Sequence, residues 1–140
     1  MTATDWAEAA ARSFEHPARR WATPGHLAAH LNPATVQTPA LDLIDTELTR
    51  LLDTPDGRLI ISMPPQEGKS TRAAGDFLVW ALTQNPDLRI VTASYAQSLA
   101  NRNGRAIRRR ITEHPDLGLR LAPDNGAVSD WTLDGHTGGV

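Results

Sequence analysis

The feature that most constrains the fold is a short apolar run that leads directly into a loop containing glycine, lysine and serine in succession. Residues 58–63 (Arg-Leu-Ile-Ile-Ser-Met) are almost continuously apolar, as expected of a strand that is buried on both faces. Pro64-Pro-Gln-Glu-Gly-Lys-Ser-Thr71 follows, and the apolar residues after it predict a helix from Lys69 to about Gln84. A strand, a loop and a helix in this order place the N–H groups and the positive dipole end of the helix at the loop.

Lys69 is the only lysine of the chain, which contains thirteen arginines. An ammonium group is a compact point charge, whereas a guanidinium is a broad planar fork, so lysine fits better among backbone N–H donors around a phosphate. We therefore expect Lys69 to act as the catalytic lysine on the β- and γ-phosphates of a nucleotide, with Ser70 on Mg²⁺ and Thr71 near the α-phosphate. The alternative is a surface loop that caps an ordinary helix, and Met63 stands where the usual pattern has its first glycine.

The chain repeats the order of strand and helix after this point. Residues 88–93 (Leu-Arg-Ile-Val-Thr-Ala) predict a second buried strand, and residues 96–113 predict a second long helix. Together these elements form a βαβ unit with parallel strands and a right-handed crossover. We therefore expect an α/β fold, a three-layer αβα domain of the P-loop NTPase type with a parallel sheet, in truncated form and preceded by short N-terminal helices.

The N-terminal part has short helices and frequent prolines. Residues 1–37 predict an appendage with helices over about 6–14 and 26–31, each of which ends at a proline. Thr38 is then an N-cap followed by proline at the first helical position, and apolar residues at helical spacing predict a helix over Pro39–Leu52. The expected organisation is a helical appendage over residues 1–37 and a partial P-loop ATPase domain over residues 38–140.

The composition excludes several classes of protein. A hydrophobic content of 40% is that of a folded chain, and a net charge of −2 is not that of a general polyanion binder. Cysteine is absent, which excludes disulfides and thiolate metal sites. No apolar run approaches the roughly 20 residues of a membrane span and the N-terminus has no signal-peptide pattern, so we expect a soluble protein that is not secreted.

Five arginines gather between residues 102 and 110, within the second predicted helix. Arg102, Arg105 and Arg109 fall at i, i+3 and i+7 and share one stripe, while Ile107 and Ile111 face inward. The functional interpretation is contact with DNA phosphates, which gives binding that depends on salt and not on sequence. One alternative is a solvated helix face, on which arginines near the C-terminus are favoured by the helix dipole. Another is an arginine finger that reaches the nucleotide of a neighbouring copy.

Four segments resemble one known family. Met63-Pro-Pro-x-x-Gly-Lys-Ser70 after an apolar strand resembles the large subunit of tailed-bacteriophage terminases, the motors that package DNA. Thr92-Ala-Ser-Tyr95 is similar to the segment that follows the second strand in that family and leads into a basic helix. Gln37-Thr-Pro-Ala-Leu41 is similar to the stretch before the family's ATPase core, where a glutamine contacts adenine. Trp131 with Gly138-Gly139-Val140 resembles the start of the next family segment, so the resemblance extends from about residue 24 to Val140.

The resemblance implies ATP and Mg²⁺ as cofactors. The implied partners are double-stranded DNA and, for the full-length family, the portal protein and the small terminase subunit, with no membrane. The implied place of action is the cytoplasm of an infected or lysogenic bacterium. The loop, the arginine stripe and the resemblance together assign nucleotide binding to Gln37, Pro65, Gln66, Glu67, Gly68, Lys69, Ser70 and Thr71, Mg²⁺ binding to Ser70, and DNA binding to Arg102, Arg105 and Arg109.

The chain departs from the family pattern in two places. Gln66-Glu67 stands where many members have a basic residue before the loop glycine, and the family's apolar strand ending in catalytic acids is not found before Val140, nor is the nuclease domain. We therefore expect the ATP-binding N-terminal part of a terminase large subunit with little or no activity alone, able to pair with the missing C-terminal part. The alternatives are a noncatalytic nucleotide- or DNA-binding fragment and another P-loop ATPase such as a helicase.

Overall fold

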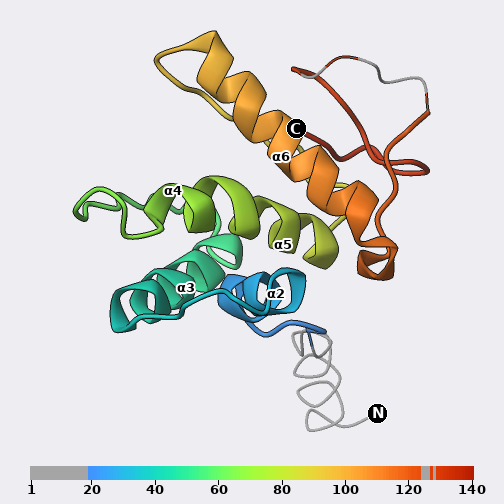
Figure 1. The fold of residues 1–140 in the computed structure, drawn as a ribbon. Coiled ribbons are helices and arrows are strands. Elements are labelled where there is room, and N and C mark those ends of the chain that lie inside the picture. Colours follow the sequence, from blue (N-terminus) through green and yellow to red (C-terminus); the bar gives the residue numbers. More distant parts are fainter. Residues whose placement is uncertain (1–18, 124–126, 128) are drawn as a thin grey trace, which may run out of the picture.

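The computed structural model describes residues 19–123, 127 and 129–140, and its regular elements are helices (Figure 1). In chain order they are α2 (Pro24–Leu31), α3 (Pro39–Leu52), α4 (Lys69–Thr71), the π-helical segment η1 (Arg72–Asp76), α5 (Phe77–Gln84), α6 (Gln97–Glu113) and the 3-10 turn η2 (Pro115–Leu117). Because α4, η1 and α5 follow one another without a break, residues 69–84 form one continuous helix. The helix expected over residues 6–14 lies outside the described residues.

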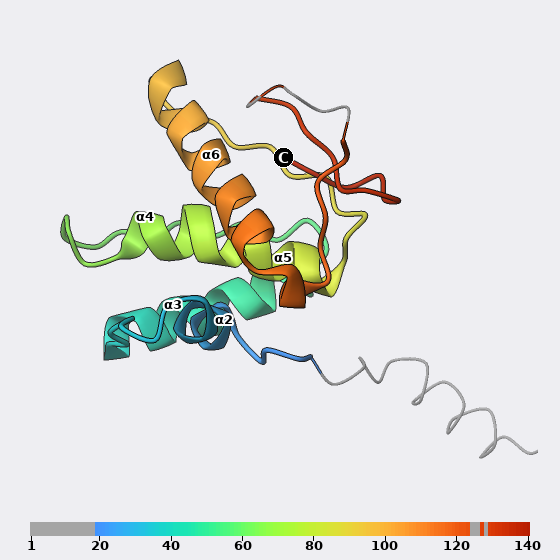
Figure 2. The same ribbon diagram turned by 45° about the vertical axis from the view of Figure 1, so that its right-hand side comes forward.

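The helices lie in three tiers. In Figure 1, α2 and α3 lie below the helix of residues 69–84, and α6 crosses above it. Figure 2 shows the same order after the rotation. The π-helical segment η1 is at the centre of this arrangement, since it contacts α2, α3 and α6. A side chain of η1 can therefore reach residues of all three neighbouring helices.

Two helices begin at the threonine–proline pairs of the sequence. Thr38 is the N-cap of α3, where its hydroxyl accepts a hydrogen bond from the Leu41 N–H, and Thr23 caps α2 in the same way through His26. Proline follows each cap at a position whose N–H has no partner inside the helix, so it costs no hydrogen bond. The predicted helix over Pro39–Leu52 is confirmed, and α2 starts two residues earlier than predicted.

The other long helices are also confirmed. The predicted helix from Lys69 to about Gln84 is present, with the π-helical segment as an unpredicted feature. The helix predicted over 96–113 is α6, in which Ile107 and Ile111 are buried as expected from their spacing.

The predicted parallel sheet is wrong, and with it the α/β fold of three-layer αβα P-loop NTPase type. Among the described residues, β-structure is limited to isolated bridges between Arg89 and Gly139, Leu121 and Leu133, and Thr132 and Gly139. Of the two segments predicted as buried strands, residues 58–63 form no bridge with any described segment, and residues 88–93 pair only at the single parallel bridge to Gly139. The expected βαβ unit is therefore not formed.

The physical reason is that a strand needs a neighbouring strand for its backbone hydrogen bonds. A run of apolar residues predicts that side chains are buried, but not that such a neighbour exists. Residues 59–63 bury alternate side chains, and Leu59, Ile61 and Met63 pack on the cluster of Leu41, Ile44 and Leu48 in α3. The intervening Ile60 faces outward and is 93% exposed. Residues 59–63 thus bury one face by packing on α3, and their backbone has no hydrogen-bonded neighbour among the described residues.

The main core lies between the helix of residues 69–84, α6 and the C-terminal segment. Trp80 and Trp131 are its largest buried side chains, together with Leu82, Ile107 and Ile111. The indole N–H of Trp80 donates to the carbonyl of Trp21 at 2.8 Å, which ties residues before α2 to this core. Residues 19–37 therefore pack against the rest of the chain, and the predicted domain boundary at residue 37 stays a prediction.

Candidate functional site

The loop before α4 is exposed and sharply curved. Residues 64–68 all lie at the surface, and the backbone has positive φ at Gln66 (66°) and Gly68 (81°). A positive φ is uncommon for a residue with a side chain, whereas glycine adopts it at no steric cost. These two positions turn the chain from the extended run of residues 58–63 into the helix that begins at Lys69.

The N-terminus of this helix presents unused donors. Gly68 is its N-cap and offers no side chain, so the first N–H groups of the helix receive no side-chain acceptor. Lys69 is half-buried, and no carboxylate among the described residues forms an ion pair with its ammonium group. Ser70 and Thr71 are exposed on the first turn. Free N–H groups, a helix dipole and an unpaired ammonium form an environment that favours a bound anion.

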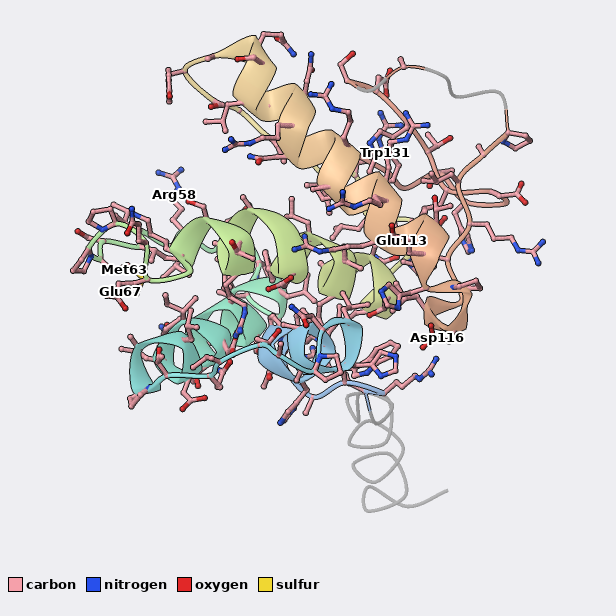
Figure 3. The ribbon with its side chains drawn as sticks, viewed as in Figure 1. Arg58, Met63, Glu67, Glu113, Asp116 and Trp131 are labelled. Carbon is pink, nitrogen blue, oxygen red and sulfur yellow. The ribbon has the colours of Figure 1, made fainter. Side chains whose placement is uncertain are left out.

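The predicted nucleotide-binding residues of the loop lie together at one end of the molecule. Pro65, Gln66 and Glu67 are exposed and contiguous with Gly68, and Figure 3 labels Met63 and Glu67 at this end. No basic side chain among the described residues forms an ion pair with Glu67. Its carboxylate is therefore solvated, which limits its repulsion of an anion at the helix N-terminus because water screens exposed charges.

Gln37 does not join this loop directly. Its side-chain amide donates to Asp42 Oδ1 at 2.9 Å and to Asp45 Oδ2 at 2.7 Å, and its carbonyl oxygen accepts from Arg72 Nη2 at 2.9 Å. Gln37 was predicted to bind nucleotide, yet its polar atoms are engaged by neighbours within the chain.

A buried network of charges lies below Gln37 and was not predicted. Arg72 is 2% exposed, and its Nη1 contacts Asp45 Oδ2 at 2.5 Å while its Nε contacts Asp76 Oδ2 at 3.4 Å. Arg110 of α6 contacts the other oxygen of Asp76 at 3.2 Å. The network therefore joins α3, η1 and α6 through alternating charges.

Burial dominates the protonation of the central acid. Desolvation raises the pKa of Asp76 above its usual value, although the cationic groups of Arg110 and Arg72 oppose this effect. The contact between Arg72 and Asp76 could have been predicted from the sequence, because the two residues are spaced i, i+4 on a predicted helix. The burial of Asp45 could also have been predicted, because Asp45 lies between Leu41 and Leu48 on the apolar face of α3.

The arginines of α6 divide into two groups. Arg102, Arg105 and Arg109 are exposed along one stripe, as predicted, and Arg109 lies 3.9 Å from Glu113 in an exposed pair. Arg110 turns inward to Asp76, and Arg108 donates to the Ala127 carbonyl at 2.9 Å. Three guanidinium groups of α6 therefore remain at the surface.

A groove connects the loop end of the helix with α6. Its volume is about 510 Å³, and it runs from Gly68 and Thr71 past Asp76 to Arg109 and Arg110. Gly68 at the end of the loop and Arg109 of the exposed stripe, which lie on separate elements, thus border one depression.

Comparison of the chain with protein families, with curated proteins and with solved structures finds no match. Among the described residues, no helix combines the length and the apolar character that crossing a membrane requires.

Proposed function

We propose that the chain is the N-terminal, ATP-binding part of a terminase large subunit, which packages double-stranded DNA in the cytoplasm of a bacterial host. The observation that supports this proposal most directly is the uncapped start of a long helix at the only lysine of the chain, behind an exposed loop. The terminase-like order of residues in this loop supplies the family assignment.

The proposed chemistry follows from the donors at this end. The N–H groups of residues 69–71 and the ammonium of Lys69 would surround the β- and γ-phosphates, and the Ser70 hydroxyl would bind Mg²⁺. Gly68 allows the backbone to approach the phosphates closely because it has no Cβ and accepts a positive φ. ATP would thus be held by positioning and charge, as phosphoryl transfer requires.

Calorimetric titration with MgATP tests the loop. We expect Lys69→Ala to weaken binding by about tenfold or more, because a hydrogen bond to a charged group is worth roughly 1.5–3 kcal/mol. Lys69→Arg should also weaken it, since the charge remains but the planar fork does not fit. Arg58→Ala is the matched control, because it removes an exposed positive charge just before the loop. Equal losses of MgATP affinity in Lys69→Ala and Arg58→Ala would mean that the loop contributes only a general electrostatic attraction.

The exposed stripe of α6 is the proposed DNA contact. Each phosphate neutralised by a cation adds about 0.9 to the slope of log K against log salt for duplex DNA. Removing Arg102, Arg105 and Arg109 together should therefore lower the magnitude of that slope by roughly 2–3, equally for two unrelated duplexes. Fluorescence anisotropy over a series of salt concentrations measures it.

The matched control for the stripe removes the same charge elsewhere. Arg58, Arg89 and Arg120 are exposed arginines that lie outside α6. Their simultaneous replacement by alanine should leave most of the slope intact. If it lowers the slope as much as the α6 variant does, DNA contact is not located on α6.

The alternatives predict different activities. Within residues 1–140 no apolar run ends in paired acids that could position an attacking water, so we propose binding of ATP with little or no turnover by this chain alone. DNA-stimulated release of phosphate that disappears in Lys69→Ala would instead favour another ATPase such as a helicase. A partner chain that supplies the strand ending in catalytic acids and restores ATP turnover would favour the terminase hypothesis.

A further inference from the structure

The side chain of Gln37 has an unusually complete set of partners for a surface residue. Both donors of its amide group are used by carboxylates, and its oxygen is used by a guanidinium. The partners determine which amide atom faces which way. Carboxylates only accept and a guanidinium only donates, so Nε2 must face Asp42 and Asp45 and Oε1 must face Arg72.

Arg72 transmits this contact to the loop. Its backbone N–H donates to the Gly68 carbonyl at 2.9 Å, which closes the first turn of the helix that starts at Lys69. Its guanidinium, below Gln37, is simultaneously anchored to Asp45 of α3 and Asp76 of η1. The position of Lys69 relative to α3 therefore depends on a residue whose side chain Gln37 helps to hold.

Close packing leaves this cluster little freedom. A Cβ added to Gly25 of α2 would lie 2.2 Å from Asp45 Oδ2, 2.8 Å from Arg72 Nη1 and 3.0 Å from Gln37 Nε2. The backbone of α2 thus closes the cluster from one side, and the glycine at this position permits the approach. Gln37 covers it from another side, at the surface.

We propose that Gln37 is a positioning residue for the loop of residues 64–68, acting through Arg72, and that it does not contact the nucleotide base. This inference rests on the proposed binding of nucleotide at that loop. A glutamine that recognises adenine in a bidentate way uses an amide N–H together with the amide oxygen, whereas both N–H groups of this amide are occupied by Asp42 and Asp45 and its oxygen accepts from Arg72.

The first test compares ligands with and without a base. Affinities for MgATP, MgGTP and magnesium tripolyphosphate are measured for the wild type, Gln37→Ala and the control Gln97→Ala, whose glutamine donates to Asn101 in the first turns of α6. We expect Gln37→Ala to weaken all three ligands by the same factor, roughly fivefold, which is the scale of a typical net hydrogen-bond contribution. Gln37→Glu should weaken them further, because it places a third carboxylate beside Asp42 and Asp45. A loss confined to MgATP would overturn the inference and make Gln37 a base contact.

The second test needs no nucleotide. Amide hydrogen exchange of the unliganded chain should be faster at residues 68–72 in Gln37→Ala, with exchange at Ile107 and Ile111 in the core unchanged. Unchanged exchange at residues 68–72 would overturn the inference, whatever the ligands do. If the wild type binds none of the three ligands, the proposed function fails, and the exchange measurement still decides whether Gln37 holds the loop.

Discussion

At the scale of single residues, the energetics of the site region are dominated by Arg72. It is the least exposed charged residue that the structure describes, and it lies between two carboxylates that are themselves 3% and 6% exposed. Removing it would leave Asp45 and Asp76 as buried charges with fewer partners, which is far more costly than losing a solvated ion pair. The Asp45 Oδ1 atom already lacks a hydrogen-bond partner among the described residues, so Asp45 has no second cation to rely on.

We expect Arg72→Met to lower the free energy of unfolding by about 3–5 kcal/mol, as measured by urea denaturation. Arg50→Met is the control, since Arg50 pairs with Glu47 at 3.1 Å on the surface of α3, and exposed pairs contribute about 0–1 kcal/mol. The double variant Asp45→Asn/Arg72→Met should recover part of the loss, because one uncompensated buried charge is removed. Equal costs for Arg72→Met and Arg50→Met would show that the network adds nothing to stability.

The residues of the network also show the limit of sequence reasoning at this scale. Lys69, Ser70 and the arginine stripe of α6 could be singled out because each pattern is local. The partners of Arg72 lie 27 residues away at Asp45 and 35 residues away at Gln37, so only the packing of helices brings them together. The resemblance to the terminase family assigned Gln37 to the nucleotide site, but the hydrogen-bond partners of its side chain could not be predicted from the sequence.

At the scale of elements, the helices were predictable and the strands were not. An N-cap, a proline and an apolar spacing of three and four residues are properties of the helix itself, and they predicted α3 with both ends correct. A strand depends on its neighbours, so the apolar runs at 58–63 and 88–93 were equally compatible with an extended segment packed on a helix. The π-helical turn η1 likewise depends on its neighbours, since it contacts α2, α3 and α6.

Gly75 in η1 provides a test of how closely α6 approaches this turn. Alanine usually stabilises a helix by up to about 1 kcal/mol relative to glycine. A Cβ at Gly75 would lie 2.5 Å from Arg110 Nη1, however, so the guanidinium that contacts Asp76 through Nη2 would have to shift. We therefore expect Gly75→Ala to destabilise the protein by about 1 kcal/mol in urea denaturation, because the lost charged contact outweighs the helical preference.

A second background separates the two effects. In Arg110→Ala the obstructing guanidinium is absent, so adding Gly75→Ala should then be neutral or stabilising. The same destabilisation in both backgrounds would mean that the cost comes from the π-helical backbone and not from Arg110.

At the scale of the whole molecule, the two extended segments leave apolar surface uncovered. Ile60 and Val91 are each 93% exposed and Tyr95 is 96% exposed, although apolar side chains of this size are usually buried. Residues 58–63 also form no backbone hydrogen bond with the other residues that the structure describes. Exposed apolar side chains beside unpaired backbone groups are the features that lead edge strands to associate with other chains.

We therefore expect the isolated chain to self-associate at micromolar concentration. The substitution Ile60→Lys should reduce this self-association. A charge on the outward face of the segment opposes pairing by desolvation and by repulsion between copies, which is how natural edge strands are protected. Val36→Lys is the control, because Val36 is also exposed but lies in the connection between α2 and α3. Sedimentation velocity should show a smaller weight-average mass for Ile60→Lys and no change for Val36→Lys. If the wild type sediments as a monomer across this range, residues 58–63 do not mediate association and the exposure of Ile60 has no consequence for assembly.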